Sequence, residues 1–183
     1  DGNCTCRAID CGAAGKHPRT ANGMKDATTD AKKIESWWSQ WPDANIGIAT
    51  GTVSGFDAVD IDPRHGGDYS LQDAKSEHGE LPETVEALTG GGGRHLLFKH
   101  AAGVRNTVGR LAGIDVRGDG GYIVVAPSRH QSGQLYSWED SSRPGEIAIA
   151  DWPTELLESL TVAHTHPTAA GAADNGKIPE GSR

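Results

Sequence analysis

The sequence lacks long apolar segments. None of its 183 residues belongs to a stretch that approaches the ~20 consecutive apolar residues a membrane helix requires. The first residues also lack the apolar core of a secretory signal peptide. We therefore expect a soluble, cytoplasmic protein that has no membrane partner.

Cysteine is scarce, and all three cysteines lie within the first eleven residues. An odd number of closely spaced cysteines is a poor disulfide framework and a better metal cluster. Cys4, Cys6, Cys11 and His17 have the spacing C-x-C-x4-C-x5-H, and three Cys with one His suit a closed, structural zinc site. The sequence therefore predicts a zinc module over residues 4–17. The alternative is three free thiols in a mobile segment.

Positive charge is in the minority. There are 17 Lys and Arg against 25 Asp and Glu, and the formal net charge is −8. An acidic chain is not the usual nucleic-acid binder, because contacts with phosphate need local Lys or Arg. Between residues 94 and 130, however, six basic residues face two acidic ones. This segment could form a basic face, or it could reflect ordinary scatter. Lys16 and Arg19 are candidate phosphate contacts beside the cysteine cluster.

The apolar pattern predicts short strands mixed with a few helices. We expect helices over 28–42, 68–79 and 153–160, and strands over 45–51, 56–62, 83–88, 94–100, 113–118, 122–128 and 134–140. The turn "GDGG" suggests that the strands at 113–118 and 122–128 form a hairpin. Strands that follow strands as well as helices indicate an α+β fold with a mixed or antiparallel sheet.

The first predicted helix carries an apolar stripe of Ile34 and three tryptophans. Thr29 is the expected N-cap, with Asp30 in the first turn. Trp37, Trp38 and Trp41 lie at helical spacing. We interpret them as part of the core rather than as a platform on which nucleic-acid bases stack.

Three acids interrupt apolar strands. Asp60 and Asp62 lie two residues apart in "AVDID", so their side chains share one face of the strand at a spacing of ~6.6 Å. Asp115 lies between Ile114 and Val116. Three convergent carboxylates suit Mg²⁺ or Mn²⁺ and could hold two ions for phosphoryl or nucleotidyl transfer. The alternatives are a solvated strand end for the pair, and an ion pair with Arg117 for Asp115.

Two further stretches suit phosphate binding. In "TGGGGRHLLF" four glycines precede the strand that carries His95, and backbone amides of such a turn can approach a phosphate closely. His95 could add a hydrogen bond. In "VAPSRH" a turn offers Arg129 and His130, which is a weaker signal.

Taken together, these stretches resemble a known family. "GKHPR", "TTDAKKIESWW", "NIGIATG", "VDID", "TGGGGRHLLF" and "GIDVRGDGGYIVVAPSRH" are similar, in this order, to the bifunctional primase-polymerase (Prim-Pol) domain of the archaeo-eukaryotic primase superfamily. They span residues 15–130. One departure is clear: the family's histidine turn more often reads T-P-S-G-G-R-H, and here Gly90 and Gly91 replace Pro and Ser.

The resemblance implies a fold and a set of site residues. The fold would be the superfamily's two-part core, with an RRM-like sheet that bears the acids and with the N-terminal cluster as a small zinc module. Asp60, Asp62 and Asp115 would be catalytic ligands of Mg²⁺ or Mn²⁺, and His95 would contact the triphosphate of the incoming nucleotide. Lys16, Arg129 and His130 are further candidates for nucleotide binding.

The resemblance also implies a reaction, partners and a domain layout. The reaction would be synthesis and extension of a primer from nucleoside triphosphates on a single-stranded DNA template, in phage or plasmid replication, and thus in the host cytoplasm if phage-encoded. The Prim-Pol domain would span 1–161, followed by a linker at 162–175. Residues 176–183 resemble the start of a helical primase C-terminal domain, and a helicase domain is expected in a longer parent protein.

The residues by themselves leave three functions open. The same acids could serve a metal-dependent phosphodiesterase or nuclease, and the zinc cluster could stabilise a non-catalytic nucleic-acid-binding module. A polymerase needs a triphosphate pocket, which the glycine turn and His95 favour. A pure binding module would not need three acids crowded together.

Overall fold

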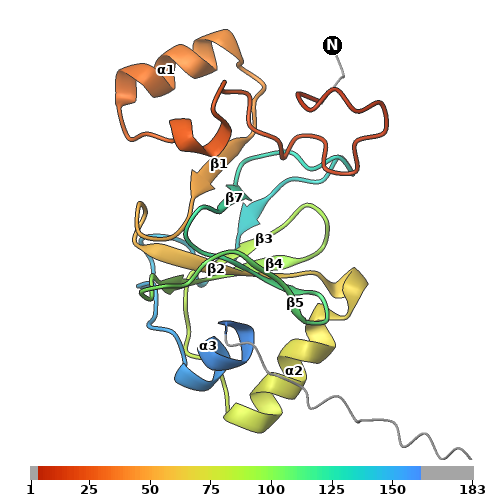
Figure 1. Cartoon of the computed structure of the whole chain (residues 1–183), viewed down its shortest axis with the longest axis vertical. Coiled ribbons are helices and arrows are strands. Elements are labelled where there is room, and N and C mark those ends of the chain that lie inside the picture. Colours follow the sequence, from red (N-terminus) through yellow and green to blue (C-terminus); the bar gives the residue numbers. More distant parts are fainter. Residues whose placement is uncertain (1–3, 162–183) are drawn as a thin grey trace, which may run out of the picture.

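The structure is a computed structural model that describes residues 4–161, and it combines two antiparallel sheets with three α-helices (Figure 1). The helices are α1 (Ala31–Gln40), α2 (Gly67–His78) and α3 (Thr154–Thr161), and the 3-10 turns are η1 (Gly23–Asp26) and η2 (Pro63–His65). The strands are β1 (Ile46–Ala49), β2 (Phe56–Ile61), β3 (Glu86–Leu88), β4 (Arg94–Lys99), β5 (Thr107–Leu111), β6 (Ile114–Arg117), β7 (Tyr122–Val125) and β8 (Ser137–Trp138). This confirms the α+β class with antiparallel sheets. The RRM-like description stays a prediction.

The larger sheet has six strands in the order β5-β6-β2-β4-β3-β8, all paired antiparallel. β2 lies at its centre between β4 and β6. One face is covered by α2 and α3, which Figure 1 shows together on one side of the sheet. Ile61, Phe98 and Leu156 are fully buried in the core between them. Burial of this apolar face holds the helices on the sheet.

The opposite face of the sheet is covered only in part. The second sheet, a pair formed by β1 and β7, packs there. Its residues Ile123 and Val125 meet the side chains of Phe56 and Ala58 in the first half of β2. The second half of β2 carries Asp60 on the same face, beyond this cover. The polar side chains at that end are therefore left beside open space.

The N-terminal segment lies beyond the β1–β7 pair, on the side away from α2 and α3 (Figure 1). Among residues 4–161, three side-chain hydrogen bonds attach it. The Tyr122 hydroxyl donates to the Lys16 carbonyl at 2.9 Å, and the Asn45 side chain donates to the Gly15 carbonyl at 2.9 Å. The Gln131 side chain donates to the carbonyl of residue 12 at 2.9 Å. The segment is thus anchored to the strands that flank the open face.

α1 forms where the pattern predicted it, but two details differ. Asp30, and not Thr29, is the N-cap, because its carboxylate accepts the amides of Lys32 and Lys33. The interpretation of the tryptophans as core is wrong, because no residue of α1 is fully buried. Their stripe faces a hollow instead of a packed interior.

The predicted hairpin between 113–118 and 122–128 is also wrong. β6 pairs with β2 in the large sheet, whereas β7 pairs with β1, whose residues lie more than seventy positions away. The loop between β6 and β7 therefore crosses from one sheet to the other. The sequence also missed β5, and it overestimated β8, which has two residues. The predicted linker and the segment 176–183 lie outside the described residues. Within the described part, no helix has the length and apolar character to cross a bilayer.

Candidate functional site

The centre of the large sheet brings three of the predicted residues side by side. Asp60 on β2 is the direct partner of His95 on β4 and of Asp115 on β6. Directly paired residues on antiparallel strands project to the same face. Asp62 follows two positions after Asp60, where β2 ends and its carboxylate caps η2 by accepting the Arg64 amide at 3.0 Å. All four line one cavity of about 380 Å³.

Asp60 and Asp115 share one cation. The guanidinium of Arg117 donates to Asp115 Oδ2 at 2.9 Å and lies 3.5 Å from Asp60 Oδ2. Burial by itself would raise the pKa of Asp60, but the hydrogen bond from His95 and the nearby positive charges outweigh it and lower that pKa. Asp60 is therefore ionised at neutral pH. The ion pair between Asp115 and Arg117 that the sequence offered as an alternative is present.

Asp62 has its own positive partners. Arg64 donates to both carboxylate oxygens at 3.0 and 2.8 Å, and His65 Nδ1 lies 3.0 Å from Oδ2. The hydrogen bonds from Arg64 hold the pKa of Asp62 far below its ordinary value. This carboxylate too is ionised under all ordinary conditions.

The donor set fits divalent ions that prefer oxygen ligands. Three carboxylates face one cavity, and two of them are already close enough to bind a single positive charge between them. Mg²⁺ and Mn²⁺ are bound in this way, by a few carboxylates together with water or substrate phosphates. A divalent ion here competes with Arg117 and Arg64 for the same oxygens.

His95 is almost fully buried, with 5% of its surface exposed. Its Nε2 lies 3.5 Å from Asp60 Oδ1. Its Nδ1 is buried and has no hydrogen-bond partner among the described residues. An orphaned buried nitrogen is uncommon in a folded protein and indicates a missing partner.

The glycine turn before β4 lies against the same cavity, which Gly91 and Gly93 line. A Cβ on Gly93 would meet the Ile61 carbonyl oxygen at 2.3 Å, so only glycine allows the turn to pack on the end of β2. A Cβ on Gly90 would meet the Cβ of His130 at 2.4 Å. The Ser132 hydroxyl donates to the Gly90 carbonyl at 2.7 Å, which fixes the turn against the loop after β7.

The remaining predicted nucleotide contacts divide between two cavities. Lys16, which the sequence offered as a phosphate contact beside the cysteine cluster, lines the carboxylate cavity. Arg129 and His130 instead line a neighbouring groove, which Lys16 also reaches. Burial lowers the pKa of His130, so this imidazole is neutral at neutral pH.

Sequence reasoning gave no role to Arg64 or Tyr136, which line the carboxylate cavity, and it named Arg117 only as an ion-pair partner of Asp115. Arg117 had a usable signal, because it lies two residues after Asp115 and so shares its face. Tyr136 had none, since it reaches the site from a loop before β8. Burial, with a smaller effect of the Asp60 charge, raises the pKa of Tyr136 to about 12, so its hydroxyl stays protonated.

The N-terminal cysteines and His17 form the predicted cluster. One ligand atom from each of Cys4, Cys6, Cys11 and His17 lies within 4.8 Å of all the others. The Cys4 Sγ is 3.0 Å from His17 Nδ1, and the Cys11 Sγ is 3.5 Å from it. Zinc–sulfur bonds of ~2.3 Å in a tetrahedron put ligand atoms ~3.8 Å apart, so the cluster fits a metal such as zinc.

The pKa of the Cys4 thiol is lowered by its neighbours in the cluster. A hydrogen bond from the backbone of Cys6, together with one from His17, lowers the pKa of Cys4 to about 6. A thiolate is the form that binds metal. Burial and the neighbouring thiols raise the pKa of Cys11 in the same cluster, so the convergence of the four ligand atoms, and not the pKa shifts, favours a metal site over three free thiols.

Comparison with known proteins identifies the family. A search of curated proteins found no match. The family model for the bifunctional DNA primase/polymerase N-terminal domain, Prim-Pol, matches residues 6–155. This range contains β2, β4 and β6 with the three aspartates and His95. Because the match covers well over half of the chain, the chain belongs to the Prim-Pol family of DNA primase/polymerase domains.

Proposed function

We propose that this domain synthesises and extends primers on single-stranded DNA by two-metal nucleotidyl transfer. The family membership supports a primase/polymerase function in general. The observation that carries the specific mechanism is the register of the central sheet, in which Asp60 is paired directly with both Asp115 and His95. Such a row of carboxylates beside a buried histidine suits a site for a metal-bound triphosphate.

In this mechanism the carboxylates of Asp60, Asp62 and Asp115 hold two Mg²⁺ or Mn²⁺ ions. When bound, the ions supply positive charge to the attacking 3′-oxygen and to the leaving pyrophosphate. The low pKa values of Asp60 and Asp62 keep these carboxylates ionised and ready to bind metal at neutral pH. Arg117, which lies between two of the acids, is then free to turn towards a phosphate.

The triphosphate is bound by groups on the rim of the same cavity. His95 can donate a hydrogen bond to a phosphate oxygen, and Lys16 adds a positive charge from the N-terminal segment. The amides of the glycine turn beside His95 complete a phosphate-binding surface. We assign Arg129 and His130 to the outer part of nucleotide binding, since they line the neighbouring groove.

We further propose that Cys4, Cys6, Cys11 and His17 hold a structural Zn²⁺. Four protein ligands leave no open coordination position, which is typical of a structural rather than a catalytic site. The metal would fix the segment that carries Lys16 close to the cavity. We propose that the domain acts in the replication of a phage or plasmid. A helicase domain is expected in the parent protein.

The test is a primer-extension and priming assay with labelled nucleotides, a single-stranded template and Mg²⁺ or Mn²⁺. The double variant Asp60→Asn/Asp62→Asn should lose at least 100-fold in rate, because it removes two metal ligands without changing side-chain volume. Asp73→Asn, an exposed aspartate on α2 away from the cavity, is the matched control. Extension that survives in the double variant contradicts the proposal. Degradation of the template in place of extension shows a nuclease.

A further inference from the structure

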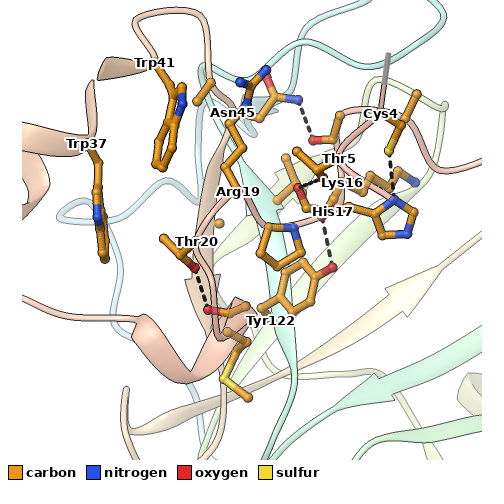
Figure 2. Close-up of a pocket in the computed structure, with 18 of the residues that line it drawn as sticks. Cys4, Thr5, Lys16, His17, Arg19, Thr20, Trp37, Trp41, Asn45 and Tyr122 are labelled. Atoms are coloured by element: carbon orange, nitrogen blue, oxygen red, sulfur yellow. Dashed lines mark hydrogen bonds between the residues drawn. The ribbon is translucent and has the colours of Figure 1, made fainter. Parts of the chain in front are cut away.

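A second cavity of about 460 Å³ lies beside the first, between α1, the N-terminal segment and the β1–β7 pair. We call it the tryptophan groove, because Trp37, Trp38 and Trp41 line it. Figure 2 shows Trp37 and Trp41 along one side, with Lys16 and Tyr122 on the other. All three tryptophans are only partly buried. Three indole rings that face a hollow form an apolar surface of the kind that marks binding sites.

The rim of the tryptophan groove is positively charged. Lys16, Arg19 and Arg129 line it, against a single acid, Asp43. Over residues 4–161, none of these three cations forms an ion pair with a carboxylate. The chain as a whole carries a net charge of −8. A local excess of unpaired cations on an acidic protein indicates an anionic ligand.

The aromatic rings differ in how free they are. Trp38 Nε1 donates to the Ala44 carbonyl at 3.2 Å, which fixes the turn after α1, so this residue has a structural role. No hydrogen bond of this kind holds Trp37 or Trp41 among the described residues. The Lys33 ammonium lies 5.6 Å from the centre of the Trp37 ring and adds another positive charge beside it. Trp37 and Trp41 are therefore the rings available to a ligand.

The groove also meets the carboxylate cavity. Lys16 lines both, so an extended ligand that follows the groove past Lys16 arrives at the cavity of Asp60. A flat aromatic partner, an anionic backbone and a path to the nucleotidyl-transfer site are properties of single-stranded nucleic acid. Proteins bind it by combining stacking rings with cations along the backbone.

We propose that the tryptophan groove binds unpaired bases of the single-stranded DNA template. The bases stack on Trp37 and Trp41, and Arg19 contacts the phosphates. This inference rests on the proposed function for its choice of template, since a domain that copies DNA must hold the unpaired strand next to its nucleotide site. The groove contacts the flat faces of the bases and not their hydrogen-bonding edges, so binding should depend little on the DNA sequence.

The experiment measures binding without nucleotides, by fluorescence anisotropy of a labelled single strand of roughly 15 nucleotides. Trp37→Leu and Trp41→Leu should each weaken binding about 5- to 100-fold, as loss of one stacking ring does. Leucine keeps the helix propensity and the apolar surface of α1. Trp37→Phe should retain most of the affinity. Tyr69→Leu, which changes an 81% exposed ring on α2, is the matched control and should leave binding unchanged.

A second readout follows the charges. Arg19→Gln should reduce the slope of log K against log salt concentration by about 0.7, the value for one phosphate contact in a single strand. The control Arg143→Gln changes an exposed arginine that pairs with Glu146, and its slope should equal that of the unsubstituted protein. An unchanged slope in Arg19→Gln contradicts the assignment of the phosphate contact.

The outcomes separate this inference from the proposed function. Asp60→Asn/Asp62→Asn should bind the single strand normally while failing to extend a primer. If the protein binds single strands through Trp37 and Trp41 but makes no product, the groove stands and the polymerase proposal fails. If both leucine variants melt like the unsubstituted protein and bind as tightly, the groove proposal is overturned. The proposal is also overturned if blunt duplex DNA binds as tightly as the single strand and its binding also depends on Trp37 and Trp41. Paired bases stacked within a duplex cannot enter the groove to contact the two rings.

Discussion

Arg117 occupies the position between Asp60 and Asp115 where we propose that a divalent ion binds. Replacing it by methionine keeps most of the aliphatic part of the side chain and removes the charged guanidinium. Arg117→Met should therefore destabilise the metal-free protein and at the same time strengthen its response to Mg²⁺ or Mn²⁺. A purely structural ion pair would produce the first effect without the second.

The size of the effect follows from the register of the sheet. Asp60 and Asp115 are direct partners on adjacent strands, so their Cβ atoms lie about 5 Å apart. Their carboxylates share one Arg117 nitrogen, so a similar separation applies to the two charges. At an effective dielectric constant of about 20, two unit charges at this distance repel each other by roughly 3 kcal/mol. The side chains are 31% and 27% exposed, so water screens part of this repulsion. We expect a loss of about 1–2 kcal/mol and a fall in Tm of about 2–8 °C.

The dependence on pH has a definite sign. Arg117 is one of the positive charges that lower the pKa of Asp60 in the folded state, so Arg117→Met should raise that pKa. The stability that a lowered folded-state pKa contributes is fully present above the unfolded pKa of about 4 and is lost as the pH falls through the folded-state pKa. The deficit of Arg117→Met relative to the unsubstituted protein should therefore be complete at neutral pH and should vanish as the pH falls below about 4.

The assay is thermal unfolding in buffer cleared of divalent ions, and again with millimolar Mg²⁺ or Mn²⁺. The metal should raise the Tm of Arg117→Met by more than it raises that of the unsubstituted protein. Arg110→Met, on the exposed strand β5, is the control and should change neither value. If Arg117→Met loses stability but gains no metal response, the three carboxylates do not form the proposed site.

Two further predictions test the surroundings of the site. Gly93→Ala should lower the free energy of unfolding, measured in urea, by about 1–3 kcal/mol, because its Cβ would clash with the Ile61 carbonyl. The control Gly47→Ala should lower it by less, because the added Cβ has no neighbour closer than 3.8 Å. Equal losses in the two variants would refute this packing argument. Metal analysis should find one zinc per chain, and Cys4→Ser should lack it. Bound zinc should be released as the pH falls, because protons compete with the metal for the Cys and His ligands. A cluster without zinc at neutral pH would contradict the proposed module.

Local patterns in the sequence predicted the parts of the site that lie close together along the chain. The alternation in β2 places Asp60 and Asp62 on one face, and the spacing of the cysteines brings their thiols near His17 within a few turns. The glycine turn was also visible as a phosphate-binding candidate. The positions of these groups could be predicted because each depends on the geometry of a single strand, turn or short loop, whereas phosphate binding by the turn stays a prediction.

Pairings between distant segments could not be predicted in the same way. The hairpin expected between β6 and β7 was wrong because a "GDGG" turn permits a hairpin but does not exclude a crossing between sheets. The tryptophans at the end of α1 predicted an apolar face, but the sequence did not show whether that face packs on the core or lines a cavity. Tyr136 reaches the cavity from far along the chain, and no local signal marks such a residue.

The sequence by itself determined the residue types of this protein's site: three acids in apolar strands, a histidine after four glycines, and a compact Cys/His cluster. Only the tertiary structure decided that Asp60 pairs with both His95 and Asp115, and that Lys16 lies between two cavities. The physical reason is that strand order and register depend on burial summed over the whole sheet. Each local segment is compatible with several partners, and the packed core selects one of them.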